Sequence, residues 1–238
     1  AAGSKEIRDY LKTRNPWTEK MLDMINWDAH GASHLYHRPQ RCYLVKMCHR
    51  HLPVGKTLHR RNAKYSPICR GCRTETETQE HDIQCQAPSR SQWRIQLLES
   101  VRLVRERLNT GSNLQGTLLN GSDNTIADRA VNRNGIFSNA LESRSDIGWI
   151  ALLRGYWSNE WQVAYEHSYS VPNEEDRKAK NKRQRQMQRW QKKIIQNIWH
   201  SMIQLWKLRN DERHGWDAES RESARREVLH YELAEIYN

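Results

Sequence analysis

The sequence has no long apolar run, almost no phenylalanine and few cysteines, and each shortage excludes a class of protein. Its 238 residues include one Phe and 37% apolar residues, and the mean hydropathy is −0.99. No stretch approaches the ~18 consecutive apolar residues of a membrane-spanning helix, so we expect no membrane association. Five cysteines are too few, and odd in number, for a disulfide-stabilised secreted scaffold.

The amino-terminal segment also lacks the features of a targeting signal. Residues 1–10 contain no apolar core of the kind that marks a secretory signal, and the chain does not begin with Met. We therefore expect a chain that is processed or excised from a longer protein. The expected location is intracellular, nuclear or organellar, and not secreted.

What the sequence has in excess is positive charge. Lys and Arg number 39 against 28 Asp and Glu, so the formal net charge is +11 and the isoelectric point is about 9.6. Such a balance predicts a polyanionic partner, most simply nucleic acid, although composition does not separate RNA from DNA or from an acidic protein. The ten Trp and nine Tyr residues are expected mainly in the core, with base stacking as the alternative use.

Helical periodicity predicts a mainly α fold, a helical protein with an embedded small zinc module and a long C-terminal helix. We divide the chain into a helical region 1–110 with the module at 65–86, a loop or linker at 111–125, and a C-terminal helical region 126–238. Helices are expected over 15–26, 39–51, 89–108, within 126–155, after Ser158, through a stripe from Trp190 to Leu205 that ends at Gly215, and over about 217–237. Residues 53–64 are expected to form a basic loop or short turn.

The most specific motif is a set of four potential metal ligands, Cys69, Cys72, His81 and Cys85. The first two can reach one ion from a tight knuckle, in which Gly71 permits the turn that directs backbone N–H groups at the thiolates. The last two share one face of a helix, which Thr78 can cap. Three thiolates and one imidazole leave no open position, so we predict one structural Zn²⁺. The alternative is four unrelated residues with buried cysteines.

The segment from Cys69 to Cys85, with its acidic Glu-Thr stretch and Glu80-His81, resembles the zinc-binding module found downstream of the polymerase in retrotransposon reverse transcriptase-like proteins, those of algae and diatoms in particular. Further similarity spans nearly the whole chain, at Ile25–Gly31, Leu52–Arg60, Ile147–Gly155, Ser158–Trp161, Trp199–Asn210 and His214–Gly215. The family's apolar-Cys-Pro ending is replaced by Gln84 and Gln86–Pro88, which is expected to weaken helix packing beside the ion. The resemblance implies a C-terminal accessory region of such a protein, or a host protein derived from one.

Other catalytic or ligand-binding signals fail. Gly55-Lys56-Thr57 lacks the earlier glycine of a phosphate-binding loop, since position 50 is Arg50. His30, His34 and His37 have metal-like spacing, but ordinary hydrogen-bonded or surface histidines explain them better. No polymerase motif and no strand-borne carboxylate–lysine set of a metal-dependent nuclease is found, so we lean against an enzyme.

Two groups of basic residues are the candidate nucleic-acid contacts. The basic strip lies within 177–193 and the knuckle patch surrounds the cysteines; the alternative for the strip is a solvated helix start. The strip consists of Lys178, Lys180, Lys182, Arg183, Arg185, Arg189, Lys192 and Lys193, and the patch of Arg60, Arg61, Lys64, Arg70 and Arg73.

Together these signals predict a non-catalytic, zinc-stabilised region that binds RNA or an RNA–DNA intermediate through backbone phosphates. The alternative is a structural subunit of a larger ribonucleoprotein or other multi-chain assembly, with protein partners on its helices. A metal-dependent nuclease is a third hypothesis, which would require a catalytic acid that the sequence does not reveal.

Overall fold

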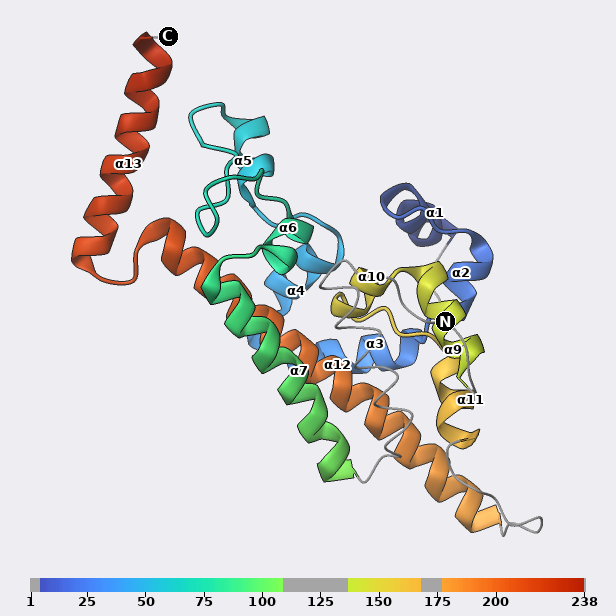
Figure 1. Cartoon of the computed structure of the whole chain (residues 1–238). Helices are drawn as coiled ribbons and strands as arrows, with labels where there is room; N and C mark the ends of the chain where they lie inside the picture. The colour runs from blue at the N-terminus through green and yellow to red at the C-terminus, as the bar shows by residue number, and fades with distance from the viewer. Residues whose placement is uncertain (1–4, 109–136, 168–176, 238) are drawn as a thin grey trace. The chain divides into compact units, whose positions relative to one another are not determined.

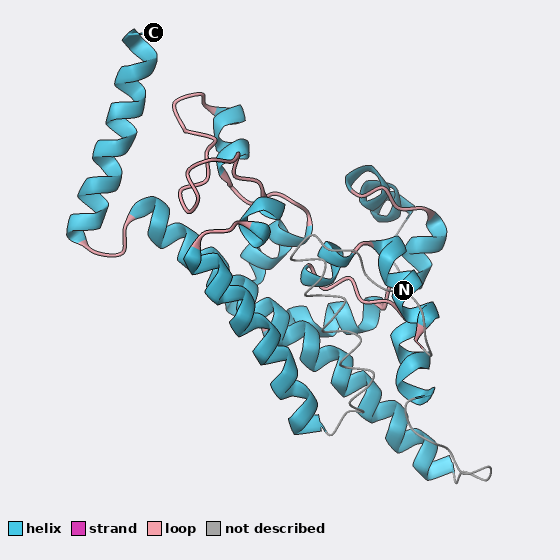
Figure 2. Ribbon diagram, in the orientation of Figure 1, coloured by secondary structure: helices cyan, strands magenta, loops and turns pink. Residues whose placement is uncertain are grey.

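Amphipathic helices account for nearly all the regular structure in the computed structural model, which describes residues 5–108, 137–167 and 177–237 (Figures 1 and 2). Within these ranges there is no strand, and only two isolated bridges pair Ile25 with Ser158 and Ile68 with Thr76. The predicted mainly α fold is therefore confirmed. The predicted linker at 111–125 lies outside the described residues, so the division of the chain at that segment stays a prediction.

The chain separates into two compact units, each assembled from two stretches of sequence. Unit 1 comprises Ala1–Leu44 and Leu97–His200, and unit 2 comprises Val45–Gln96 and Ser201–Asn238. Three helices run from one unit into the other along the chain: α4 (Arg41–Cys48), α7 (Pro88–Leu108) and the long α12 (Arg177–His214).

Unit 1 is organised around buried tryptophans. It contains α1 (Lys5–Arg14), α2 (Glu19–Met24), α3 (Trp27–Tyr36), the short 3₁₀ helix η1 (Arg38–Gln40), α9 (Ser138–Ile147), α10 (Trp149–Leu153), α11 (Glu160–His167) and the first part of α12. Trp157, Trp161, Trp190 and Trp199 are among its largest fully buried side chains. The core role expected for most tryptophans is thus confirmed for these four.

Polar contacts fix the register of the α12 stripe in unit 1. Asn26 caps α3 and donates from its side chain to Gln191 at 2.8 Å, where both residues are buried. Gly155 has a φ of +81° and packs on the Trp199 ring, so a Cβ at this position would collide with the indole. The stripe Trp190, Ile194 and Ile198 is buried in unit 1 as the periodicity predicted, and its continuation, Met202 and Leu205, is buried in unit 2.

Unit 2 carries the cysteine-rich segment. It contains α5 (Gly55–Arg61), α6 (Gln79–Gln84), α13 (Ala218–Tyr237) and the adjoining parts of α4, α7 and α12. Trp93 of α7 is buried and donates from its ring N–H to the carbonyl of Ser201 at 2.7 Å, which ties α7 to α12 within this unit.

Two local predictions are wrong, for identifiable reasons. The first predicted helix begins at Glu19 rather than Asn15, because Thr18 accepts the cap hydrogen bond from Met21 N–H. Residues 55–61 form the helix α5 rather than a loop. The basic sequence of this segment does not indicate a helix, but the Glu77 carboxylate accepts a hydrogen bond from the N–H of Gly55 at its first residue.

Candidate metal centre

The four predicted ligand residues converge on one point. One donor atom from each of Cys69, Cys72, His81 and Cys85 lies within 4.8 Å of every other, and three of the four residues are buried. The Cys69 and Cys85 sulfurs are 3.8 Å apart, and Cys72 Sγ lies 3.4 Å from His81 Nε2. The cluster can therefore hold a metal ion.

The Cys69–Cys85 and Cys72–His81 distances match two of the six edges of a tetrahedron around a zinc-sized ion. With Zn–S near ~2.3 Å and Zn–N near ~2.05 Å, the edge between two sulfurs is roughly 3.8 Å and that between sulfur and nitrogen roughly 3.5 Å. A disulfide would instead need sulfurs roughly 2 Å apart, and all five cysteines are free thiols.

The knuckle between Cys69 and Glu75 directs backbone N–H groups at sulfur, as predicted. The N–H groups of Gly71 and Cys72 donate to the Cys69 sulfur, and those of Thr74 and Glu75 donate to the Cys72 sulfur. The residue of this turn with left-handed backbone is Arg73, with a φ of +61°, and not the predicted Gly71. A Cβ on Gly71 would lie 3.2 Å from Ala87 Cβ and 3.6 Å from the sulfurs of Cys69 and Cys85, so this glycine provides room beside the thiolates.

The other two ligands come from α6 and its end. Thr78 accepts a hydrogen bond from the backbone N–H of His81, and Cys85 follows as the residue that terminates the helix. His81 Nε2 faces the sulfurs, while its Nδ1 lies 3.2 Å from a Glu75 carboxylate oxygen. Such a carboxylate orients an imidazole ligand and increases its basicity.

Hydrophobic support beside the cluster is small. Ile83 is buried and Ala87 packs on the cysteines, whereas Tyr65 at the start of the segment is 42% exposed. The missing apolar-Cys-Pro ending is thus compensated by Ala87. Arg94 also donates to the carbonyls of Ile83 and Cys85, at 3.0 and 2.7 Å, and holds the end of α6 on α7.

The thiols differ in their readiness to ionise. Burial raises the pKa of Cys69 to about 12 and also raises the pKa of Cys85. Burial opposes ionisation of Cys72 as well, but the hydrogen bonds from Thr74 and Glu75 prevail and lower its pKa to about 6. A metal ion must therefore displace protons from two of the three sulfurs.

A buried ion-pair network, missed by the sequence analysis, anchors the knuckle. Glu77 is 2% exposed and accepts from Arg209 Nε at 2.7 Å and from Arg213 Nη1 at 3.0 Å, both on α12. It also accepts from Gly55 N–H at the start of α5, where a Cβ would lie 2.8 Å from the same carboxylate. In a phosphate-binding loop the backbone N–H groups at Gly55-Lys56-Thr57 would bind a phosphate. Here the N–H of Gly55 binds the carboxylate of Glu77 instead.

A second network fixes α6. Buried Arg90 of α7 contacts Asp82 at 2.9 Å and forms a two-pronged pair with Glu212 of α12, with both nitrogen–oxygen distances 2.9 Å. The module is therefore held by α7 and α12 as well as by its four ligands.

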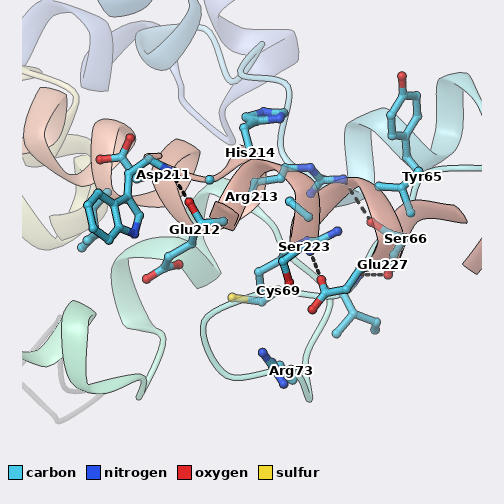
Figure 3. Close-up of a pocket in the computed structure, with 18 of the residues that line it drawn as sticks. Tyr65, Ser66, Cys69, Arg73, Asp211, Glu212, Arg213, His214, Ser223 and Glu227 are labelled. Carbon is cyan, nitrogen blue, oxygen red and sulfur yellow. Dashed lines mark hydrogen bonds and ion pairs between the residues drawn. The ribbon is translucent and has the colours of Figure 1, made fainter. Parts of the chain in front are cut away.

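Beside the knuckle lies a groove of about 1050 Å³, bounded by residues 64–73, the end of α12 and α13 (Figure 3). Its lining carries both signs of charge, with Lys64, Arg70 and Arg73 on one side of the balance and acids that include Asp211 and Glu227 on the other. Arg70 forms an ion pair with Glu227 across it.

The predicted nucleic-acid contacts are distributed as follows. In the knuckle patch, Arg60, Arg61, Lys64 and Arg73 are exposed and Arg70 is half-buried. In the strip, Lys182, Arg185, Arg189 and Lys193 are exposed, while Arg183 and Lys192 are half-buried. The side chains of Lys178 and Lys180 lie outside the described part of the chain.

The histidines of α3 behave as the hydrogen-bonding hypothesis expects. His30 Nδ1 lies 3.0 Å from the carbonyl of Gly155, and the His30 ring stacks on Tyr156. His37 Nε2 lies 3.0 Å from the carbonyl of Gln196, and burial lowers the pKa of His37. Each of these two rings thus serves the unit 1 core.

Comparison with known proteins gives no match to any family model, curated protein or solved structure. No helix in the described ranges is long and apolar enough to cross a membrane.

Proposed function

We propose that the four-residue cluster binds a single Zn²⁺ that shapes the module and takes no part in catalysis. The observation that supports this proposal is the convergence of three cysteine sulfurs and one histidine nitrogen within 4.8 Å of one another, a number and kind of donors typical of a structural zinc site. Thiolate and imidazole donors favour zinc over hard ions such as Mg²⁺.

Metal content tests this proposal directly. The purified chain should contain about one zinc ion per molecule by mass spectrometry, and Cys69→Ser should lose it. Cys42→Ser is the matched control, because Cys42 is an exposed thiol outside the cluster. A wild-type chain that neither contains nor takes up zinc would contradict the assignment.

The basic strip supports a second part of the proposal, that the protein binds nucleic acid through backbone phosphates. Lys182, Arg185, Arg189 and Lys193 recur at helical spacing on one exposed face of α12, whereas Met187, Trp190 and Ile194 are buried on the other. The cations are thus presented by a helix whose opposite face is anchored in the unit 1 core. The resemblance of residues 69–85 to a retrotransposon module supports RNA or an RNA–DNA intermediate as the partner.

Charge neutralisation on the strip is the decisive test. The triple variant Lys182→Gln/Arg185→Gln/Arg189→Gln should bind RNA more weakly, and the slope of log affinity against log salt should shrink by about one per lost contact. The control Lys5→Gln/Lys20→Gln/Arg102→Gln removes the same charge from exposed positions elsewhere in unit 1. Equal losses in both variants would show that only net charge matters.

A structural subunit of a multi-chain assembly is the second candidate, and α13 favours it. None of the described side chains of this 20-residue helix is buried, and Leu229 and Leu233, one turn apart, are 57% and 49% exposed. Most helical stability in proteins comes from packing an apolar face against a neighbour, so a partner that covers Leu229 and Leu233 would stabilise α13. The neutral variant Leu229→Gln/Leu233→Gln should then abolish co-purification of partners while RNA affinity stays unchanged.

A further inference from the structure

An exposed aromatic ring lies beside the basic strip, within the same unit. Tyr36 is the last residue of α3 and its side chain is 61% exposed. The ammonium of Lys193 lies 5.2 Å from the centre of the Tyr36 ring, a cation–π contact. The next residue, His37, is buried and contacts the carbonyl of Gln196 on α12. The position of the ring relative to the strip is therefore fixed by tertiary contacts.

Further exposed cations follow Tyr36 in the chain and precede Lys193 along α12. Arg38 in η1 and Arg41 at the start of α4 are exposed and follow Tyr36 closely in the chain. Along α12, Arg189 and Lys193 are one turn apart, about 6 Å along the axis, which is close to the separation of neighbouring phosphates in an extended single strand. An aromatic ring at the end of a cationic track is the arrangement by which proteins hold single-stranded nucleic acid.

We propose that Tyr36 is a stacking platform for an unpaired base of a single-stranded segment whose phosphates follow Arg189, Lys193 and the neighbouring strip. This inference rests on the proposed nucleic-acid binding. In the free protein Lys193 covers the ring; in the complex a base takes its place, and the ammonium pairs with the adjacent phosphate. A base inside a duplex is already stacked on both faces, so the platform selects single strands.

Equilibrium binding of an oligonucleotide of about 12 nucleotides and of the matching duplex tests the platform. Tyr36→Leu should weaken single-strand binding about tenfold with an unchanged salt slope, whereas Tyr36→Trp should retain it. Duplex binding should change less than about twofold in either variant. Tyr65→Leu is the control, because Tyr65 is an exposed tyrosine of unit 2.

An abasic strand separates stacking from a merely structural role. Removing the bases should weaken wild-type binding and leave Tyr36→Leu unaffected. If Tyr36→Leu binds single strands like wild type while the Lys182/Arg185/Arg189 variant does not, the platform is refuted and nucleic-acid binding stands. If Tyr36→Leu weakens duplex and single strand alike, the ring has a structural role only. If wild type binds neither, the proposed function itself fails.

Discussion

At the scale of single residues, spacing identified the metal ligands but not the residue that anchors them. Two cysteines in a knuckle and a histidine and cysteine one helical turn apart need only local chain geometry to meet. Glu77 lies in an acidic Glu-Thr stretch that looks like solvated surface. Its partner Arg209 is 132 residues away, so no local pattern could reveal the pair.

Loss of the Glu77 carboxylate should destabilise the protein strongly without removing a metal ligand. Glu77→Gln leaves Arg209 and Arg213 buried with no counter-charge, and breaking such a pair costs roughly 3–5 kcal/mol. The measurement is urea unfolding of zinc-loaded protein. Glu99→Gln, which disturbs only an exposed pair with Arg102, should cost less than about 1 kcal/mol.

The pH dependence of that cost follows from the direction of the pKa shift. Burial opposes ionisation of Glu77, but hydrogen bonds and attraction from Arg209, Arg213 and Gly55 N–H prevail and lower its pKa. A lowered folded-state pKa contributes stability that is present above the carboxyl's unfolded value and is lost as pH falls through the folded value. The stability gap between wild type and Glu77→Gln should therefore narrow in acid, below pH ~4.5. A stability gap that widens in acid would show that burial raises the pKa of Glu77 by more than the arginines lower it.

At the scale of elements, helices with an apolar stripe could be predicted and helices held by polar contacts could not. The buried face of α12 and its end at Gly215 follow from spacing alone. By contrast, α5 consists mainly of polar and basic residues, and the Glu77 carboxylate at its first turn becomes visible only in three dimensions. The start of α2 shows a third case. Pro16 indicated a helix that begins at residue 15, but Thr18 caps the helix and it begins at Glu19.

Gly215 should be essential for the turn between α12 and α13. Its φ is +78°, and a Cβ there would run into the backbone of Ser220 and Arg221. Gly215→Ala therefore strains the backbone, at a cost of order 1–3 kcal/mol, and should loosen the first turn of α13. Hydrogen exchange would show this as faster exchange at residues 218–222. Gly31→Ala is the control, because no atom lies within 4 Å of a Cβ at Gly31.

At the scale of the whole molecule, the two units differ in what stabilises them. The described part of unit 1 buries six tryptophans, Trp17, Trp149, Trp157, Trp161, Trp190 and Trp199. The module of unit 2 has a small cluster of Cys69, Cys85 and Ala87 beside the proposed ion position, and ion pairs support it. This division could not be predicted from the sequence, because each unit is formed by two stretches that are far apart in the chain.

Metal removal should consequently affect one unit far more than the other. Chelation removes the bonds from the ion to its four ligands and leaves the Cys69 and Cys85 thiols protonated. The amides of residues 69–85 should therefore lose most of their protection against hydrogen exchange. The Glu77 network joins the knuckle to α5, and amides of α5 should follow. Amides of α12 near Trp190 belong to the unit 1 core and should stay protected. Equal loss of protection in both units would show that the ion stabilises the chain as a single cooperative body.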